Sequence, residues 1–264
     1  MQQEQLDKLK AWFTGYVGQF YGGDPYINAH IKLKEDHTHR TCREILFLAE
    51  ELGLDANQKR IAEATALLHD IGRFKQFLDY RTYNDAKSID HCSLGVDVLR
   101  RAKVLEPLDD HESLLIETAV KYHGCKELPR NLNGQLMLFS KLIRDADKLD
   151  VFYVVTENYR QHKDNPDQFI LELEFPDEQH YSPQVVQAIL AEQLIDYGKL
   201  RTLNDMKLCQ LGWVYDVNFT AALKRIRQER FLEKLLAFLP ETPDIDLVRR
   251  KILSYVEQRI HRET

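Results

Sequence analysis

The chain has 264 residues, of which 44% are hydrophobic and 30% are charged, as in ordinary globular proteins. Its formal net charge of −6 disfavours nucleic acid or an anionic membrane surface as the main partner, although a bound metal could attract a small phosphorylated substrate. The sequence begins without an apolar leader, and no apolar run approaches the roughly 18 residues that span a bilayer. The four cysteines show no CxxC spacing. We therefore expect a cytoplasmic protein in a reducing compartment, with no membrane contact.

Helical periodicity dominates the chain and predicts an all-α fold: a helical bundle with additional C-terminal helices. Helices are expected over 3–20, 37–52, 57–70, 90–103, 110–123, 135–160, 183–197, 202–210, 217–238 and 245–261, with Gly- and Pro-containing turns between them. The segment 169–175 alternates apolar with acidic residues, as a short strand or hairpin would. We expect a metal-binding helical domain over 1–160, with its core at 30–160. Residues 161–264 would form a C-terminal extension, packed on that domain or joined to it by the polar segment 161–181.

Six residues that can bind a divalent metal are spread along these helices. They are His37, His69, Asp70, His91, His123 and Asp147. Neighbouring residues on a helix point about 100° apart, so His69 and Asp70 can share a metal only where a helix ends. Gly72 follows at once and predicts such an end. Small residues on the same face as His69 would leave room for the metal and its waters.

The first and last of the six are chosen by helix position. Asp36 is a candidate N-cap that would place His37 in the first turn of its helix, where the helix dipole favours the neutral imidazole. On a helical wheel Asp147 lies at the edge of the apolar stripe and Asp150 near its centre, whereas Asp145 lies opposite and is expected to be solvated. Buried carboxylates need partners, so we expect Asp147 to bind metal and Asp150 to support a ligand.

His91 and His123 decide between one metal and two. Each alone is more typical of a core histidine that has a hydrogen-bond partner, but together with the other four they form a candidate second metal site. Cys92 and Cys125 adjoin them and raise a zinc–thiolate alternative. The high frequency of small buried cysteines in protein cores argues against that alternative.

The motifs His37-x-x-Arg40, AxALLHDIGRF at 64–74 and ADKL at 146–149 resemble the HD-domain superfamily of metal-dependent phosphohydrolases, over roughly residues 30–160. The resemblance implies an all-α fold in which His37, His69, Asp70 and Asp147 bind one metal. In binuclear members two further histidines bind a second metal, and His91 and His123 stand in suitable places. Asp70 would then bridge the two ions. The family most often has lysine where this chain has Arg73, which keeps the charge and offers a fork for phosphate oxygens.

These observations predict a metal-dependent phosphohydrolase that uses a metal-activated water on a phosphomonoester or phosphodiester, of a nucleotide or a small metabolite. One or two divalent ions (Mn, Mg, Fe, Ni, Co or Zn) would be the cofactor. Asp70 and Arg73 are expected to be catalytic, and His91 or His123 could protonate the leaving oxygen if only one metal binds. Arg73, Arg81 and Lys87 are candidates for substrate binding. The alternatives are a di-iron oxygenase with the same ligands and a non-catalytic nucleotide-sensing module. The sequence leaves the substrate, the metal and the oligomeric state open.

Overall fold

The computed structural model describes residues 1–166 and 175–262. All regular secondary structure in these residues is helical, which confirms the predicted all-α fold. The strand or hairpin predicted near 169–175 lies, except for its last residue, outside the described residues. None of the described helices is both long and apolar enough to cross a membrane.

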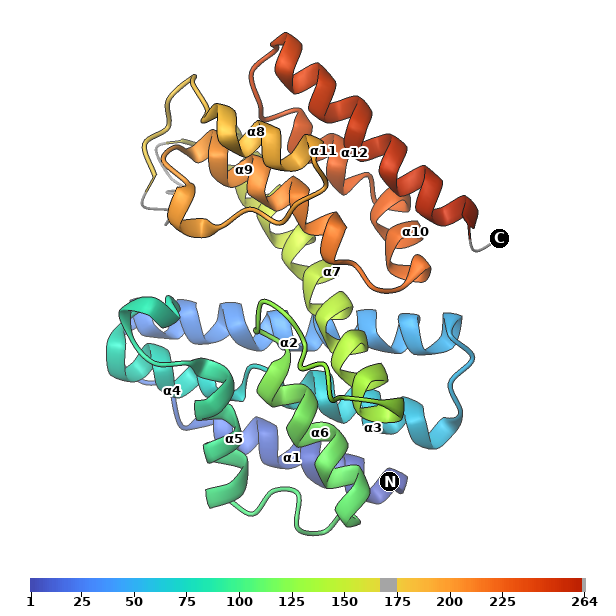
Figure 1. Ribbon diagram of the computed structural model, residues 1–264. Helices are drawn as coiled ribbons and strands as arrows, with labels where there is room; N and C mark the ends of the chain where they lie inside the picture. Colours follow the sequence, from blue (N-terminus) through green and yellow to red (C-terminus); the bar gives the residue numbers. More distant parts are fainter. Residues whose placement is uncertain (167–174, 263–264) are drawn as a thin grey trace. The chain divides into compact units, whose positions relative to one another are not determined.

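The chain divides into two compact units, Met1–Asp150 and Val151–Thr264, and the division falls within one long helix, α7. The helices that begin in the first unit are α1 (Gln3–Gly18), α2 (Pro25–Glu51), α3 (Ala56–Leu68), α4 (Ile71–Tyr80), α5 (His91–Arg101), α6 (Asp110–Tyr122) and α7 (Gly134–Asp164), with a 3-10 turn at Asp85–Lys87 (Figure 1).

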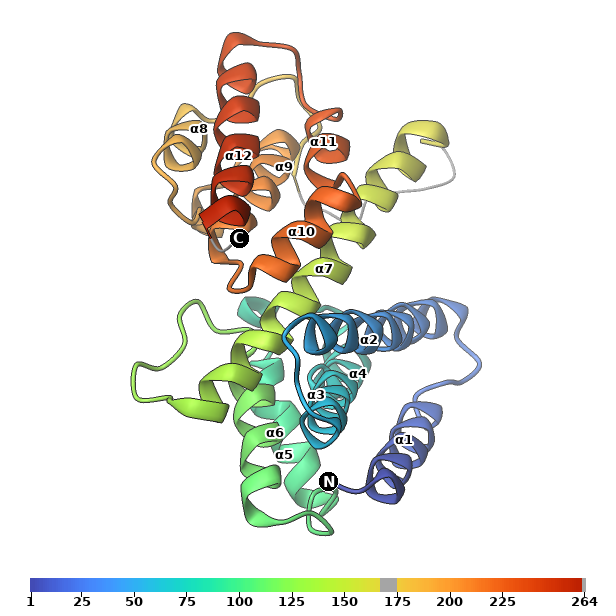
Figure 2. The same ribbon diagram turned by 90° about the vertical axis from the view of Figure 1, so that its right-hand side faces the viewer.

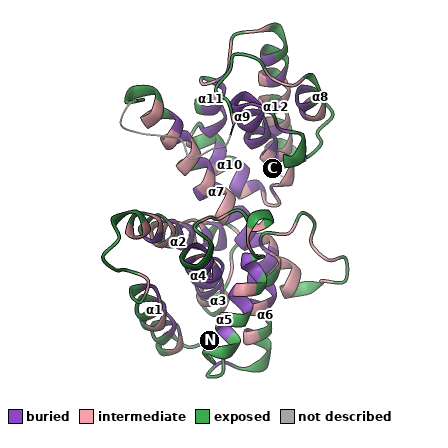
Figure 3. Ribbon diagram, turned by 90° about the vertical axis from the view of Figure 1, so that its left-hand side faces the viewer, coloured by how far each residue is buried: buried purple, intermediate pink, exposed green. Residues whose placement is uncertain are grey.

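The centre of the first unit is α3. It packs against α1, α2 and α6, and from Ile61 to Leu68 every residue except Glu63 is buried (Figure 3). The turned view in Figure 2 shows α2 beside α3. The small residues Ala62, Thr65 and Ala66 are fully buried on the side that leads to His69. This deep burial agrees with the mostly apolar sequence of the helix.

The second unit holds the C-terminal helices α8 (Pro183–Leu190), α9 (Leu203–Gly212), α10 (Thr220–Gln228), α11 (Phe231–Leu236) and α12 (Pro243–Arg262), with 3-10 turns at Tyr197–Lys199 and Trp213–Asp216. Every residue of α9 is buried, including Asp205 and Lys207. The Asp205 carboxylate accepts from the backbone N–H groups of Ser182 and Arg201, and the Lys207 ammonium donates to the carbonyl of Phe238. These partners offset the cost of burying charge in the middle of the unit.

Two differences from the predicted helices affect the site. The helix expected over 37–52 begins at Pro25, because Asp24 accepts hydrogen bonds from the backbone N–H groups of Tyr26 and Ile27 and proline favours the first helical position. The amphipathic helix α4 was not predicted at all. His37 therefore lies in the middle of α2. Asp36 is not an N-cap there, and the helix N-terminus is too far away for its dipole to favour the neutral imidazole.

Candidate metal centre

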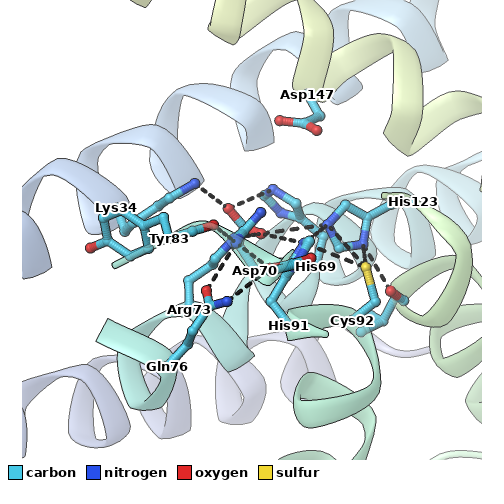
Figure 4. A network of polar contacts seen from close by, with 12 residues as sticks. Lys34, His69, Asp70, Arg73, Gln76, Tyr83, His91, Cys92, His123 and Asp147 are labelled. Carbon is cyan, nitrogen blue, oxygen red and sulfur yellow. Dashed lines mark hydrogen bonds and ion pairs between the residues drawn. The ribbon is translucent and has the colours of Figure 1, made fainter. Parts of the chain in front are cut away.

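The six candidate ligands converge in the first unit from six helices or helix ends. His37 lies within α2, His69 caps the C-terminus of α3 and Asp70 directly precedes α4. His91 begins α5, His123 caps the C-terminus of α6, and Asp147 comes from α7. The four histidines and Asp70 are all buried, at 5% exposure or less, whereas the Asp147 side chain is 27% exposed. Figure 4 shows most of this set at close range.

The histidines form two pairs. The Nε2 atoms of His37 and His69 lie 3.2 Å apart, and Asp147 Oδ1 is 3.2 Å from His37 Nε2. The Nε2 atoms of His91 and His123 lie 3.1 Å apart. Since a zinc–nitrogen bond is about 2.0–2.1 Å long, two nitrogens on one ion lie about 3.0–3.4 Å apart. Both spacings fit a metal ion between the rings.

Asp70 stands between the two pairs. Its Oδ2 is 3.5 Å from His37 Nε2 and 3.7 Å from His69 Nε2. Its Oδ1 is 3.4 Å from the Nε2 atoms of both His91 and His123. One carboxylate thus presents one oxygen to each histidine pair, which is the arrangement that a bridging ligand needs.

The Nδ1 atoms of the four histidines point outwards and are all hydrogen-bonded. In each pair the first histidine contacts a carboxylate at 2.6 Å: His37 contacts Asp150 Oδ2 and His91 contacts Asp85 Oδ2. The second histidine in each pair contacts the backbone carbonyl three residues earlier, at 2.7 Å for His69 and 2.8 Å for His123. A donating Nδ1–H leaves the Nε2 lone pair free for a metal, so these contacts orient all four rings towards the centre.

The electrostatics of the cluster suit it to binding cations, whether protons or metal ions. Burial lowers the pKa of His69 to about 4, so this imidazole is neutral. Burial opposes ionisation of Asp70, but the charge of Lys34 holds the pKa of its carboxyl well below the usual range. Burial and Lys34 lower the pKa of His37, and hydrogen bonds with Asp147 and Asp150 outweigh them and raise it. A metal at His37 therefore has to displace a proton.

The second pair has the same balance. Burial lowers the pKa of His91 and His123, but hydrogen bonding to Asp85 raises that of His91, and Cys92 and Asp70 raise that of His123. Asp85 itself has its pKa lowered to about 2, because the His91 hydrogen bond and the Arg73 charge outweigh burial. Protons therefore compete with metal at His91 and His123 as well.

Gly72 allows α4 to lie directly against α5. A Cβ atom at this position would be 2.3 Å from the backbone oxygen of His91 and 2.7 Å from the backbone nitrogen of Gly95. The predicted helix end at the His-Asp pair exists, since α3 ends at Leu68 and α4 begins at Ile71. However, Gly72 lies inside the first turn of α4. It matters for the close approach and is not the residue that stops α3.

Arg73 and Lys34 carry positive charge to the same carboxylate (Figure 4). Lys34 Nζ donates to Asp70 Oδ2 at 2.7 Å, and Arg73 Nε lies 3.5 Å from Asp70 Oδ1. A terminal nitrogen of Arg73 donates to Asp85 Oδ1 at 2.8 Å and to the backbone oxygen of Tyr83 at 2.6 Å. Asp85 thus contacts both Arg73 and the ligand His91.

Cys92 lies beside the second histidine pair. Its Sγ is 3.4 Å from His91 Nε2 and 3.6 Å from His123 Nδ1, and these three residues could together hold a metal. Burial opposes a thiolate here, but His123 and His91 outweigh it and lower the pKa of Cys92 to about 6. By contrast, the Cys125 thiol donates to the backbone oxygens of Tyr122 and Glu127.

The remaining predicted residues have different outcomes. Asp150 is buried, as the wheel predicted, and also accepts from Arg40. The prediction that Asp145 is solvated is wrong, because its side chain is fully buried in α7. Arg81 and Lys87 are exposed on the segment after α4, and their role in substrate binding stays a prediction.

Three contributing residues were not singled out from the sequence: Lys34, Tyr83 and Asp85. Lys34 lies one turn before His37, so a helix extended back to the Asp24-Pro25 signal would have placed both on one face. Tyr83 and Asp85 lie in a polar stretch whose contacts depend on the tertiary fold.

An all-helical unit with a buried cluster of histidine and aspartate defines a candidate metalloprotein domain. The family model of the HD domain matches residues 37–151, which include all six candidate ligands. The chain therefore carries an HD domain over these residues, and the resemblance inferred from its motifs is confirmed. Comparisons with curated proteins and with solved structures gave no significant match.

Proposed function

We propose that this protein is a metal-dependent phosphohydrolase that cleaves a phosphomonoester or phosphodiester of a nucleotide or another small metabolite. The observation that carries the proposal is the position of Asp70, with one oxygen facing each histidine pair and a cationic side chain beside each oxygen. HD domains are typically found in metal-dependent phosphohydrolases, which supports the same assignment.

The donor set fits borderline divalent metals. His37, His69, Asp70 and Asp147 would hold one ion, and Asp70, His91 and His123 would hold a second. When bound, two such ions would polarise phosphoryl oxygens and lower the pKa of a water so that it can attack phosphorus. Asp150 and Asp85 keep the Nε2 atoms of His37 and His91 turned towards the ions by accepting from their Nδ1–H groups.

The contribution of Arg73 is to bind the phosphoryl group. Its Nε is buried, and no hydrogen-bond acceptor for it exists among the residues that the structure describes. A buried N–H without an acceptor is costly, and a phosphoryl oxygen would satisfy it. Its terminal nitrogen is fixed by Gln76, Tyr83 and Asp85, so the guanidinium is already oriented before a substrate arrives.

The test is hydrolysis by the full-length protein, loaded separately with Mn, Fe, Co, Ni, Zn or Mg, on a panel of nucleotides and small phosphoesters. We expect phosphate or nucleotide release with at least one metal, and loss of both activity and bound metal in Asp70→Ala with helical circular dichroism retained. Asp79→Ala is the matched control, because Asp79 lies on α4, the helix that Asp70 precedes, and forms an exposed ion pair with Lys75.

Three results would contradict the proposal. Full activity in Asp70→Ala would mean that the cluster is not the active site. Two irons with oxygen consumption and no hydrolysis would favour an oxygenase. Tight nucleotide binding with no turnover under any metal would favour a sensor.

A further inference from the structure

Lys34 brings an ammonium group to the middle of the candidate metal centre. It lies on α2 one helical turn before His37, and its side chain is only 16% exposed. Its Nζ donates to Asp70 Oδ2 at 2.7 Å, the oxygen that faces His37 and His69. A lysine is not a metal ligand while it is charged, so its place here needs a different explanation.

Tyr83 positions Lys34 and Arg73 together. Lys34 Nζ lies 5.3 Å from the centroid of the Tyr83 ring, within the range of a cation–π contact. The Tyr83 hydroxyl donates to the backbone oxygen of His30 on α2 at 2.8 Å, and the Tyr83 backbone oxygen accepts from Arg73 at 2.6 Å. Tyr83 thus contacts both cations. Figure 4 shows the side chains of Lys34 and Arg73 approaching Asp70 from the side on which Tyr83 lies.

Asp70 is the carboxylate that both cations share. Lys34 contacts one of its oxygens and Arg73 Nε lies near the other, yet that Nε has no hydrogen-bond acceptor among the described residues. In the function proposed above, Asp70 also gives its oxygens to metal ions. The Lys34 ammonium and the Arg73 Nε–H then need another acceptor, since Asp85 pairs with the terminal nitrogen of Arg73 and not with its Nε. The proposed reaction supplies one in the phosphoryl group.

We propose that Lys34 and Arg73 form a two-cation subsite beside Asp70 that binds the oxygens of a phosphoryl group, both in the substrate and in the inorganic phosphate released. The inference rests on the proposed function for the role of Asp70 as a metal ligand. Lys34 acts as a compact point charge and Arg73 as an oriented donor. Tyr83 contacts both cations and so helps to hold them beside Asp70.

The experiment measures binding of inorganic phosphate to the metal-loaded full-length protein by calorimetry, with metal content determined on the same samples. Lys34→Met should keep its metal and weaken phosphate binding by about tenfold or more, the size expected for loss of one charge-assisted hydrogen bond. Lys34→Arg should recover part of the affinity. Lys32→Met is the matched control, since Lys32 lies on the same helix but pairs with Asp36 at the surface.

Unchanged phosphate affinity in Lys34→Met would overturn the inference. So would a parallel loss of metal, because Lys34 would then act only through the metal ligands. If the variant does not fold, lysines of the wild-type protein are acylated with and without phosphate, and the labelling of each lysine is measured by mass spectrometry. Phosphate should protect Lys34 and not Lys32, and equal labelling with and without phosphate would overturn the subsite. A protein that binds phosphate through Lys34 but hydrolyses nothing refutes the proposed function and leaves the subsite standing.

Discussion

Gly72→Ala should disturb the second histidine pair through the backbone of α5. The added Cβ would lie 2.3 Å from the backbone oxygen of His91, where ordinary contact begins at 3.4 Å, so this oxygen has to move by about 1 Å. The added Cβ cannot avoid this clash by moving towards Gly95, because the backbone nitrogen of Gly95 is itself only 2.7 Å away. Overpacking of this kind costs about 1–3 kcal/mol of unfolding free energy. The gain in helix propensity from alanine, at most about 1 kcal/mol, offsets only part of it.

The same shift should reduce metal binding at the second site, because ligand distances tolerate only about 0.2 Å of error. Urea denaturation of the metal-free protein gives the stability, and metal analysis of the loaded protein gives the stoichiometry. Gly15→Ala is the control, since Gly15 lies within α1 and a Cβ there meets nothing within 4 Å. Unchanged stability together with full metal loading in Gly72→Ala would refute the reasoning.

Two further predictions concern the groups around the ligands. Asp85→Asn should weaken metal binding at the His91–His123 site by about 10–100-fold and leave the other site unchanged, and Asp150→Asn should do the reverse. The reason is that each carboxylate accepts from the Nδ1–H of a ligand in one pair only. Competition with a metal-sensitive dye measures both affinities, and equal effects of the two variants on both sites would contradict the prediction. Metal affinity should also fall steeply from about pH 8 to about pH 6. The pKa values of His37, His91 and His123 are raised, so these histidines take up protons as the pH falls, and they must lose those protons to bind metal. A flat profile in metal titrations over this range would show that the three histidines are not ligands.

The helix end at His69-Asp70 was predicted at the right place from local signals, although the glycine used for that prediction lies inside α4 and does not end α3. The role of Gly72 could not be predicted, since it depends on α5, a separate segment of chain. The start of α2 could also have been predicted from the sequence, because the Asp24-Pro25 pair is a local capping signal.

The contrast between Asp145 and Asp147 shows the limit of a helical wheel. The wheel assumes one buried face, but this part of α7 is buried on more than one side. Arg144 donates to the backbone oxygens of His123 and Cys125, and Asp145 is fully buried, while the Asp147 side chain is 27% exposed. Asp147 contacts His37 because of its position along α7. The ADKL motif indicates this role of Asp147 better than the pattern of hydrophobic residues around it does.

The central claim is that one carboxylate, Asp70, joins two metal sites. Its most direct test is the number of metal ions bound per chain, measured by elemental analysis at saturation in the wild-type protein and in Asp70→Ala. We expect two ions per chain in the wild type and loss of both in the variant. Saturation at one ion per chain, or a variant that keeps two, would contradict it.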